Sequence, residues 1–304
     1  MDLAPEELQF LKLPDILREA VAIPKHCPNT FYLITLTVIF PLSFASLAQP
    51  LFTDSLLAHL QTYPQADPSQ TSHESTLLLL FQFFYLCFLT AFSLVPTAAV
   101  VYTVASLYSS KPVSFSSTMS AIPKVFKRLF VTFVCVALLL IAYNFVLFTF
   151  FVIIATADST SGRFLLFLSS AAVLLLFLLV DVYMSALWHL ASVVSVLEPV
   201  HGFAAVKKSR ELLKGKTRYA FTLVFLILAI CFVIGVVFGL VVVHGGNNYG
   251  VFVRIVVGGF LVFVVVIVNL VGLLVQSVFY YVCKSYHHQG IDKNALHDHL
   301  GEYL

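Results

Sequence analysis

Residues 199–243 read PVHGFAAVKKSRELLKGKTRYAFTLVFLILAICFVIGVVFGLVVV. A proline-led segment edged with lysines and arginines leads directly into residues 219–243, which contain no Asp, Glu, Lys or Arg. About 20 apolar residues are enough for a helix to cross the hydrocarbon core of a bilayer. The stretch therefore predicts a basic link at the membrane surface, followed by a transmembrane helix.

The same order of a link and an apolar run occurs at two other places. A link that begins at Pro112 leads through Lys127 and Arg128 into the uncharged stretch 129–157. Residues 8–25, which end at Lys25, precede the apolar stretch 31–52. We therefore predict an internal repeat of three units, each with an amphipathic cytosolic helix, a span, an outer turn and a second span. Pro123 is expected to interrupt the helix of the middle unit.

Composition indicates an integral membrane protein of the all-α class. The 304 residues are 60% hydrophobic and 11% charged, whereas soluble domains carry roughly 25% charged residues. The alternating polarity of a membrane barrel is absent from the apolar runs. We predict a polytopic bundle of six transmembrane helices, at residues 31–52, 77–108, 129–157, 163–198, 219–244 and 252–283. These limits divide the chain into an N-terminal segment (1–30), a six-span domain (31–283) with links 109–128 and 199–218, and a tail (284–304).

The distribution of basic residues predicts the orientation. Of the 17 Lys and Arg residues, all except Arg163 and Arg254 lie in the N-terminal segment, the two links or the tail. Loops that are rich in Lys and Arg stay in the cytosol. Both termini are therefore expected in the cytosol, although the sequence does not distinguish an endomembrane from the plasma membrane.

The two links supply candidate contacts to anionic lipid headgroups. Basic amphipathic segments at a membrane surface attract such headgroups. The alternative is that the links pack under the spans and that their charges serve topology alone. The candidates are Lys124, Lys127 and Arg128 in the first link, and Lys207, Lys208, Arg210 and Lys214 in the second.

Asp181 is an acid well inside the fourth span, and such a residue is a functional candidate by default. Amide side chains on other spans could pair with it: Asn144, Asn269, Gln276 and Gln82. The group is either a set of hydrogen bonds between helices or an ion or proton site. His189 lies eight residues further on, off the face of Asp181, and with Trp188 is expected to mark the cytosolic interface.

Gly235 and Gly239 form a GxxxG pattern in the fifth span. Such a pattern permits a second helix to approach closely. We expect the partner to be another helix of the same chain rather than a second copy.

Motifs of catalysis are not found in the sequence. It contains no Walker loop, nucleophile elbow or HExxH pattern. Its cysteines are single, without the spacing of metal ligands. The net charge of +2 is too small to indicate a nucleic-acid partner. We expect no enzymatic activity, cofactor or metal site, and the bilayer as the partner.

Five stretches resemble a family of plant multi-span membrane proteins without an established function: LPDILRE (13–19), TFYLITL (30–36), PLSFA (41–45), AAVVYTVASLY (98–108) and KPVSFSST (111–118). Some members of that family carry the label of a partner of a poly(A)-binding protein, which no residues here support. The six-span pattern is more distantly similar to the membrane domain of some bacterial glycerophosphodiester phosphodiesterases. Because the chain has no counterpart of their catalytic barrel, we expect their activity not to carry over.

Two hypotheses of function follow. The first is a non-enzymatic membrane protein that organises lipid or partner proteins from the cytosolic face of an endomembrane. The second is a small-solute or ion transporter that uses Asp181. A hydrated cavity that reaches Asp181 would favour transport, and a dry bundle would favour the first hypothesis.

Overall fold

The computed structural model describes residues 8–62, 68–109, 114–157, 163–247 and 249–288. Within these ranges the chain is helical and contains no strand. Six helices are long and apolar enough to cross a membrane. They cover 28–53, 79–108, 115–153, 168–197, 217–243 and 251–286, so the predicted membrane bundle of six spans is confirmed.

The helices of the first half of the chain include the first two spans. Two 3-10 turns (η1 and η2) and one π-helical turn (η3) accompany the regular helices, in the order η1 (Leu8–Phe10), α1 (Leu13–Ala22), η2 (Ile23–Lys25), α2 (Pro28–Ile34), η3 (Thr35–Ile39), α3 (Phe40–Thr62) and α4 (Pro68–Tyr108).

The second half contains the other four spans. In chain order its helices are α5 (Phe115–Ala157), α6 (Arg163–Leu197), α7 (Phe203–Leu213), α8 (Thr217–Phe238), the π-helical η4 (Gly239–Val243), η5 (Gly245–Asn247) and α9 (Val251–Tyr286).

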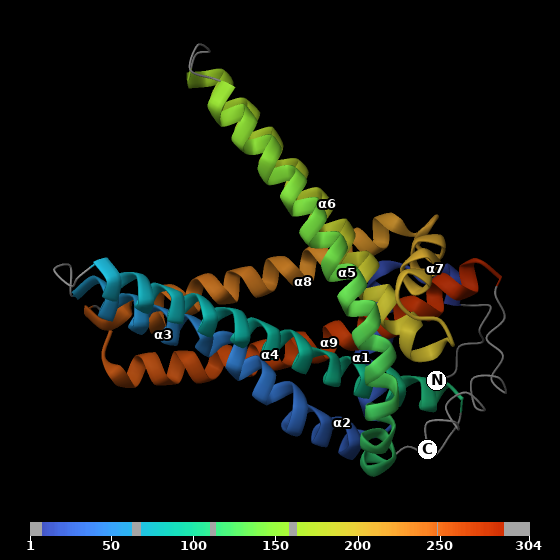
Figure 1. Ribbon diagram of the computed structural model, residues 1–304. Coiled ribbons are helices and arrows are strands. Elements are labelled where there is room, and N and C mark those ends of the chain that lie inside the picture. Colours follow the sequence, from blue (N-terminus) through green and yellow to red (C-terminus); the bar gives the residue numbers. More distant parts are fainter. Residues whose placement is uncertain (1–7, 63–67, 110–113, 158–162, 248, 289–304) are drawn as a thin grey trace.

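The six long helices form two arms that diverge from a common base (Figure 1). One arm consists of α3, α4, α8 and α9, and the other is the α5–α6 hairpin. We use "base" for the end where α1, α2 and α7 pack around the ends of the long helices. The described parts of the predicted links and of the N-terminal segment lie at this end, whereas α4, α6 and α9 begin at the outer ends of the arms.

The core is concentrated at the base. Three long helices are buried there at every position over 96–106, 190–197 and 274–283. Small side chains such as Ala99, Ala105 and Ala191 allow neighbouring helices to surround these segments. The second, fourth and sixth spans are longer than one bilayer crossing, and their ends extend into this packed base.

The outer parts of the arms expose large apolar side chains. Phe145 and Phe148 on α5 are 70% and 66% exposed, and Phe232 on α8 is 72% exposed. In water such patches would aggregate, whereas in a bilayer they contact lipid tails. The exposed belt therefore supports the assignment of the arms to the membrane.

Two details of the sequence interpretation are wrong. The helix of the middle unit is not interrupted at Pro123, because α5 continues through it from Phe115 into the span. A Cβ atom built at Gly235 or at Gly239 would meet nothing within 4 Å, so the GxxxG pattern makes no close contact with another described helix. The α8–α9 contact instead buries the bulky residues Ile234 and Phe238, which occupy another face of α8.

Candidate functional site

His189 on α6 and Gln276 on α9 form a hydrogen bond between two spans. The His189 Nδ1 atom lies 2.9 Å from the Gln276 Oε1 atom. An amide oxygen only accepts, so Nδ1 carries the ring proton and Nε2 remains as an acceptor. The His189 ring is thus bonded inside the protein, and its expected position at the cytosolic interface stays a prediction.

The amide nitrogen of Gln276 is left without a hydrogen-bond partner. The side chain is 9% exposed, and its Nε2 atom is buried with no acceptor among the described residues. A buried donor without an acceptor costs about 1–3 kcal/mol. Such a group requires an explanation, and a bound molecule is one.

Next to this pair lies a cavity of about 240 Å³, at the junction of the two arms. Segments of η3, α3, α4, α6, α8 and α9 line it. Most of the lining is apolar, and no Asp, Glu, Lys or Arg belongs to it. Its polar side chains are Ser93, Thr97, His189, Ser192, Asn269 and Gln276.

Asn269 fixes one wall of this cavity. Its Nδ2 atom donates to the Ser43 Oγ atom at 2.8 Å, which joins α9 to α3. Asn269 and Gln276 are seven residues apart, or about two helical turns, and so share a face of α9. Two of the amides singled out in the sequence therefore line one cavity.

The other polar candidates lie elsewhere. Asn144 donates to the Leu140 carbonyl of its own helix at 2.9 Å and lines a second cavity, of about 310 Å³, within the α5–α6 hairpin. The Gln82 Oε1 atom lies 3.5 Å from the Thr53 Oγ1 atom. These candidates do not form one cluster with the amides of α9.

Asp181 is half-buried on α6 and belongs to the lining of neither cavity. Within the described part of the chain, the hydrogen bonds of the four candidate amides go to partners other than Asp181. The reason is geometric: Asp181 precedes His189 by eight residues, which places it about 12 Å further from the base along α6.

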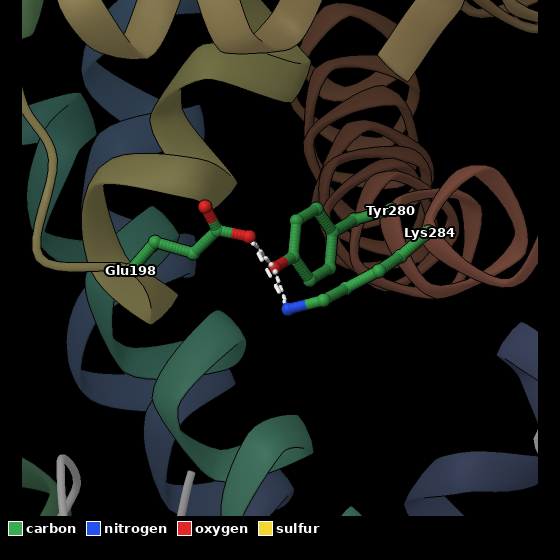
Figure 2. Close-up of polar contacts among 3 residues, drawn as sticks. All are labelled: Glu198, Tyr280 and Lys284. Carbon is green, nitrogen blue, oxygen red and sulfur yellow. Dashed lines mark hydrogen bonds and ion pairs between the residues drawn. The ribbon is translucent and has the colours of Figure 1, made fainter. Parts of the chain in front are cut away.

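A polar network closes the base between α6 and α9 (Figure 2). Tyr280 donates its hydroxyl proton to the Glu198 Oε1 atom at 2.7 Å, and the Lys284 ammonium lies 3.2 Å from the same oxygen. The Lys284 ammonium also donates to the Tyr280 hydroxyl at 3.2 Å. Glu198 follows the last residue of α6, so this network connects the two arms below their point of divergence.

The α7 helix presents one buried face and one basic face. Ser209 donates to the Leu187 carbonyl at 3.0 Å, and Ala205 and Leu212 are buried beside it. The basic residues lie outside this buried face: Lys207, Arg210 and Lys214 are exposed, and Lys208 is half-buried. In the first link, Lys124 and Lys127 are exposed and Arg128 is half-buried.

Lys216 differs from the other basic residues of its link, because it is 9% exposed. Its ammonium donates to the Gln9 carbonyl at 3.0 Å and lies over the rings of Tyr219 and Tyr286. Sequence reasoning missed this role, as it missed Glu198 and Tyr280. The burial of Lys216 cannot be inferred from a link in which six of the 20 residues are basic.

Comparisons with known proteins place the chain in a family without assigning an activity. No curated protein and no solved structure matches it. The resemblance to plant multi-span proteins and to the phosphodiesterase membrane domain therefore stays a prediction. Residues 1–304 match the family described as "Domain of unknown function (DUF8558)", and the chain belongs to that family.

Proposed function

We propose that this is a non-enzymatic membrane protein, with both termini in the cytosol, that binds anionic lipid headgroups through the basic face of α7. The observation that carries the proposal is the division of α7 into a buried face held by Ser209 and an exposed face with Lys207 and Arg210, which Lys214 continues directly after the helix. Exposed cations beside a bilayer attract anionic headgroups by about 1 kcal/mol each.

The charge pattern of the base supports the orientation. The described part of every basic link lies at this end, whereas Arg254 lies at the outer end of α9. The Arg254 Nε atom donates to the Val242 carbonyl at 2.9 Å. A base rich in Lys and Arg, with only Arg163 and Arg254 towards the outer ends, is the distribution that keeps the base in the cytosol.

The placement of α1 and α7 supports the internal repeat. Each helix precedes a span at the base and buries small or aliphatic residues, Ile16 and Ala20 in α1 and Ala205 and Leu212 in α7. In the middle unit the corresponding segment is the start of α5, where Ala121 is buried. The repeat gives the protein three amphipathic segments on one side of the membrane.

The α7 proposal is tested by replacing Lys207, Lys208, Arg210 and Lys214 with alanine in the full-length protein. We expect the preference for spin-labelled phosphatidylserine over phosphatidylcholine in nanodiscs to fall by about tenfold or more. Electron paramagnetic resonance measures the immobilised fraction of each lipid. The preference should also weaken with salt.

The matched control for this experiment keeps the charges. In it Lys207, Lys208 and Lys214 become arginine, and we expect an unchanged preference for phosphatidylserine. If the alanine variant prefers phosphatidylserine as strongly as the wild type does, these charges serve topology alone and the proposal is contradicted.

A transporter built on Asp181 is the competing hypothesis, and the position of Asp181 argues against it. The cavity between the arms does not include this residue in its lining. We therefore expect Asp181→Asn to leave proton and ion flux into proteoliposomes equal to that of the wild type. Flux that the wild type supports and the variant loses, with thermal unfolding unchanged, would instead establish transport.

A further inference from the structure

We propose that the cavity at the junction of the arms binds a neutral membrane lipid with a free hydroxyl group, of the diacylglycerol type. Its hydroxyl would lie at the His189–Gln276 pair, and an acyl chain would occupy the apolar part of the cavity. This site is separate from the basic face of α7, so either can fail without the other.

The apolar part of the cavity is matched to a hydrocarbon chain. Its lining includes Leu223, Val224 and Ile227 of α8 and Phe279 of α9. Leu228, also in the lining, is 42% exposed on the apolar surface of its arm. Because that surface faces lipid tails in a bilayer, a chain can enter from the membrane without crossing water.

The polar part requires a group that both donates and accepts. The Gln276 Nε2 atom is a buried donor without an acceptor, and the His189 hydrogen bond through Nδ1 leaves its Nε2 atom as an acceptor. A hydroxyl group offers a lone pair to the first and a proton to the second. A carbonyl group could serve the first atom alone.

The lining also excludes a charged headgroup. No Asp, Glu, Lys or Arg lines the cavity, and an unpaired ion in an apolar site is strongly disfavoured. A phosphate or a carboxylate would meet no cation there. The occupant is therefore neutral, in contrast to the anionic lipids proposed for α7.

Trp188, the single tryptophan of the chain, lines this cavity and reports on its contents. Bromine atoms on a lipid chain quench tryptophan fluorescence at close range. The probe is a diacylglycerol with dibrominated acyl chains, titrated into full-length protein in phosphatidylcholine nanodiscs. We expect saturable quenching of Trp188 at mole fractions at which dibrominated phosphatidylcholine gives little.

Two variants and one chemical analogue test the polar end and the chain site. Gln276→Leu should raise the apparent dissociation constant by about tenfold, the size expected for a lost hydrogen bond in a dry site. Ser93→Leu, which fills part of the cavity, should also weaken binding. The 3-O-methyl ether of the probe keeps an acceptor and loses the donor, and should bind more weakly than the alcohol.

The matched control is Gln82→Leu, the same substitution at a glutamine that does not line the cavity. It should bind the probe like the wild type, and thermal unfolding in nanodiscs should confirm that each variant folds. If Gln276→Leu fails to fold, Ser93→Leu and the methyl ether decide the question. Equal quenching by dibrominated phosphatidylcholine, or equal binding of alcohol and ether, would overturn the proposal.

Discussion

Glu198→Ala is expected to lower the free energy of unfolding by about 2 kcal/mol, because it removes the acceptor of a buried tyrosine hydroxyl and the partner of a half-buried lysine. Glu198 accepts from Tyr280, which is 1% exposed, and pairs with Lys284. The substitution leaves the Lys284 ammonium without its counter-charge and the Tyr280 hydroxyl without its acceptor. Equilibrium unfolding in mixed micelles, followed by circular dichroism, measures the change.

The controls for Glu198→Ala separate the network from general effects of charge. Glu211→Ala removes an exposed carboxylate from α7 and should change stability by less than about 0.5 kcal/mol. The double variant Glu198→Leu with Lys284→Met removes both charges and should recover part of the loss. Equal stability of Glu198→Ala and Glu211→Ala would show that the network contributes nothing.

Gly202→Ala is the second substitution with a large expected effect, about 2–3 kcal/mol of destabilisation. Gly202 precedes α7 with φ +66° and ψ −139°, a conformation that residues with a Cβ atom rarely adopt. Its N–H group donates to the Thr132 Oγ1 atom at 2.8 Å, and Thr132 Oγ1 lies 2.7 Å from the Ser195 Oγ atom. Strain at Gly202 therefore disturbs the junction of α5, α6 and α7.

The comparison for Gly202→Ala is Gly235→Ala on the exposed face of α8, where an added Cβ atom meets nothing within 4 Å. A helical glycine gains about 0.5–1 kcal/mol on replacement by alanine. The two substitutions should thus shift the unfolding midpoint in opposite directions. Shifts of the same sign and size would refute the conformational argument for Gly202.

The sequence was sufficient to predict the membrane spans, because bilayer thickness sets a length and an apolarity that a run such as 219–243 must have. It also identified Asn269 and Gln276 as polar groups within spans, although not with the right partners. Span prediction uses properties of one helix at a time, and this is why it succeeded here.

The arrangement of the spans could not be predicted in the same way. The divergence of the α5–α6 hairpin depends on which helices pack at the base, and separates Asp181 from the amides of α9. The GxxxG pattern of α8 failed for a similar reason: small residues permit a close contact, but the bulky side chains of Ile234 and Phe238 fill the face that α9 meets.

The packing of α1 against the end of α9 has a consequence for synthesis of the protein. Ile16 and Ala20 on α1 are 1% and 0% exposed, and the helix that packs against α1 at the base is the last one described, α9. Because the ribosome makes α9 long after α1, the apolar face of α1 stays uncovered until the sixth span has been inserted. A chain that stops before α9 lacks the surface against which α1 packs.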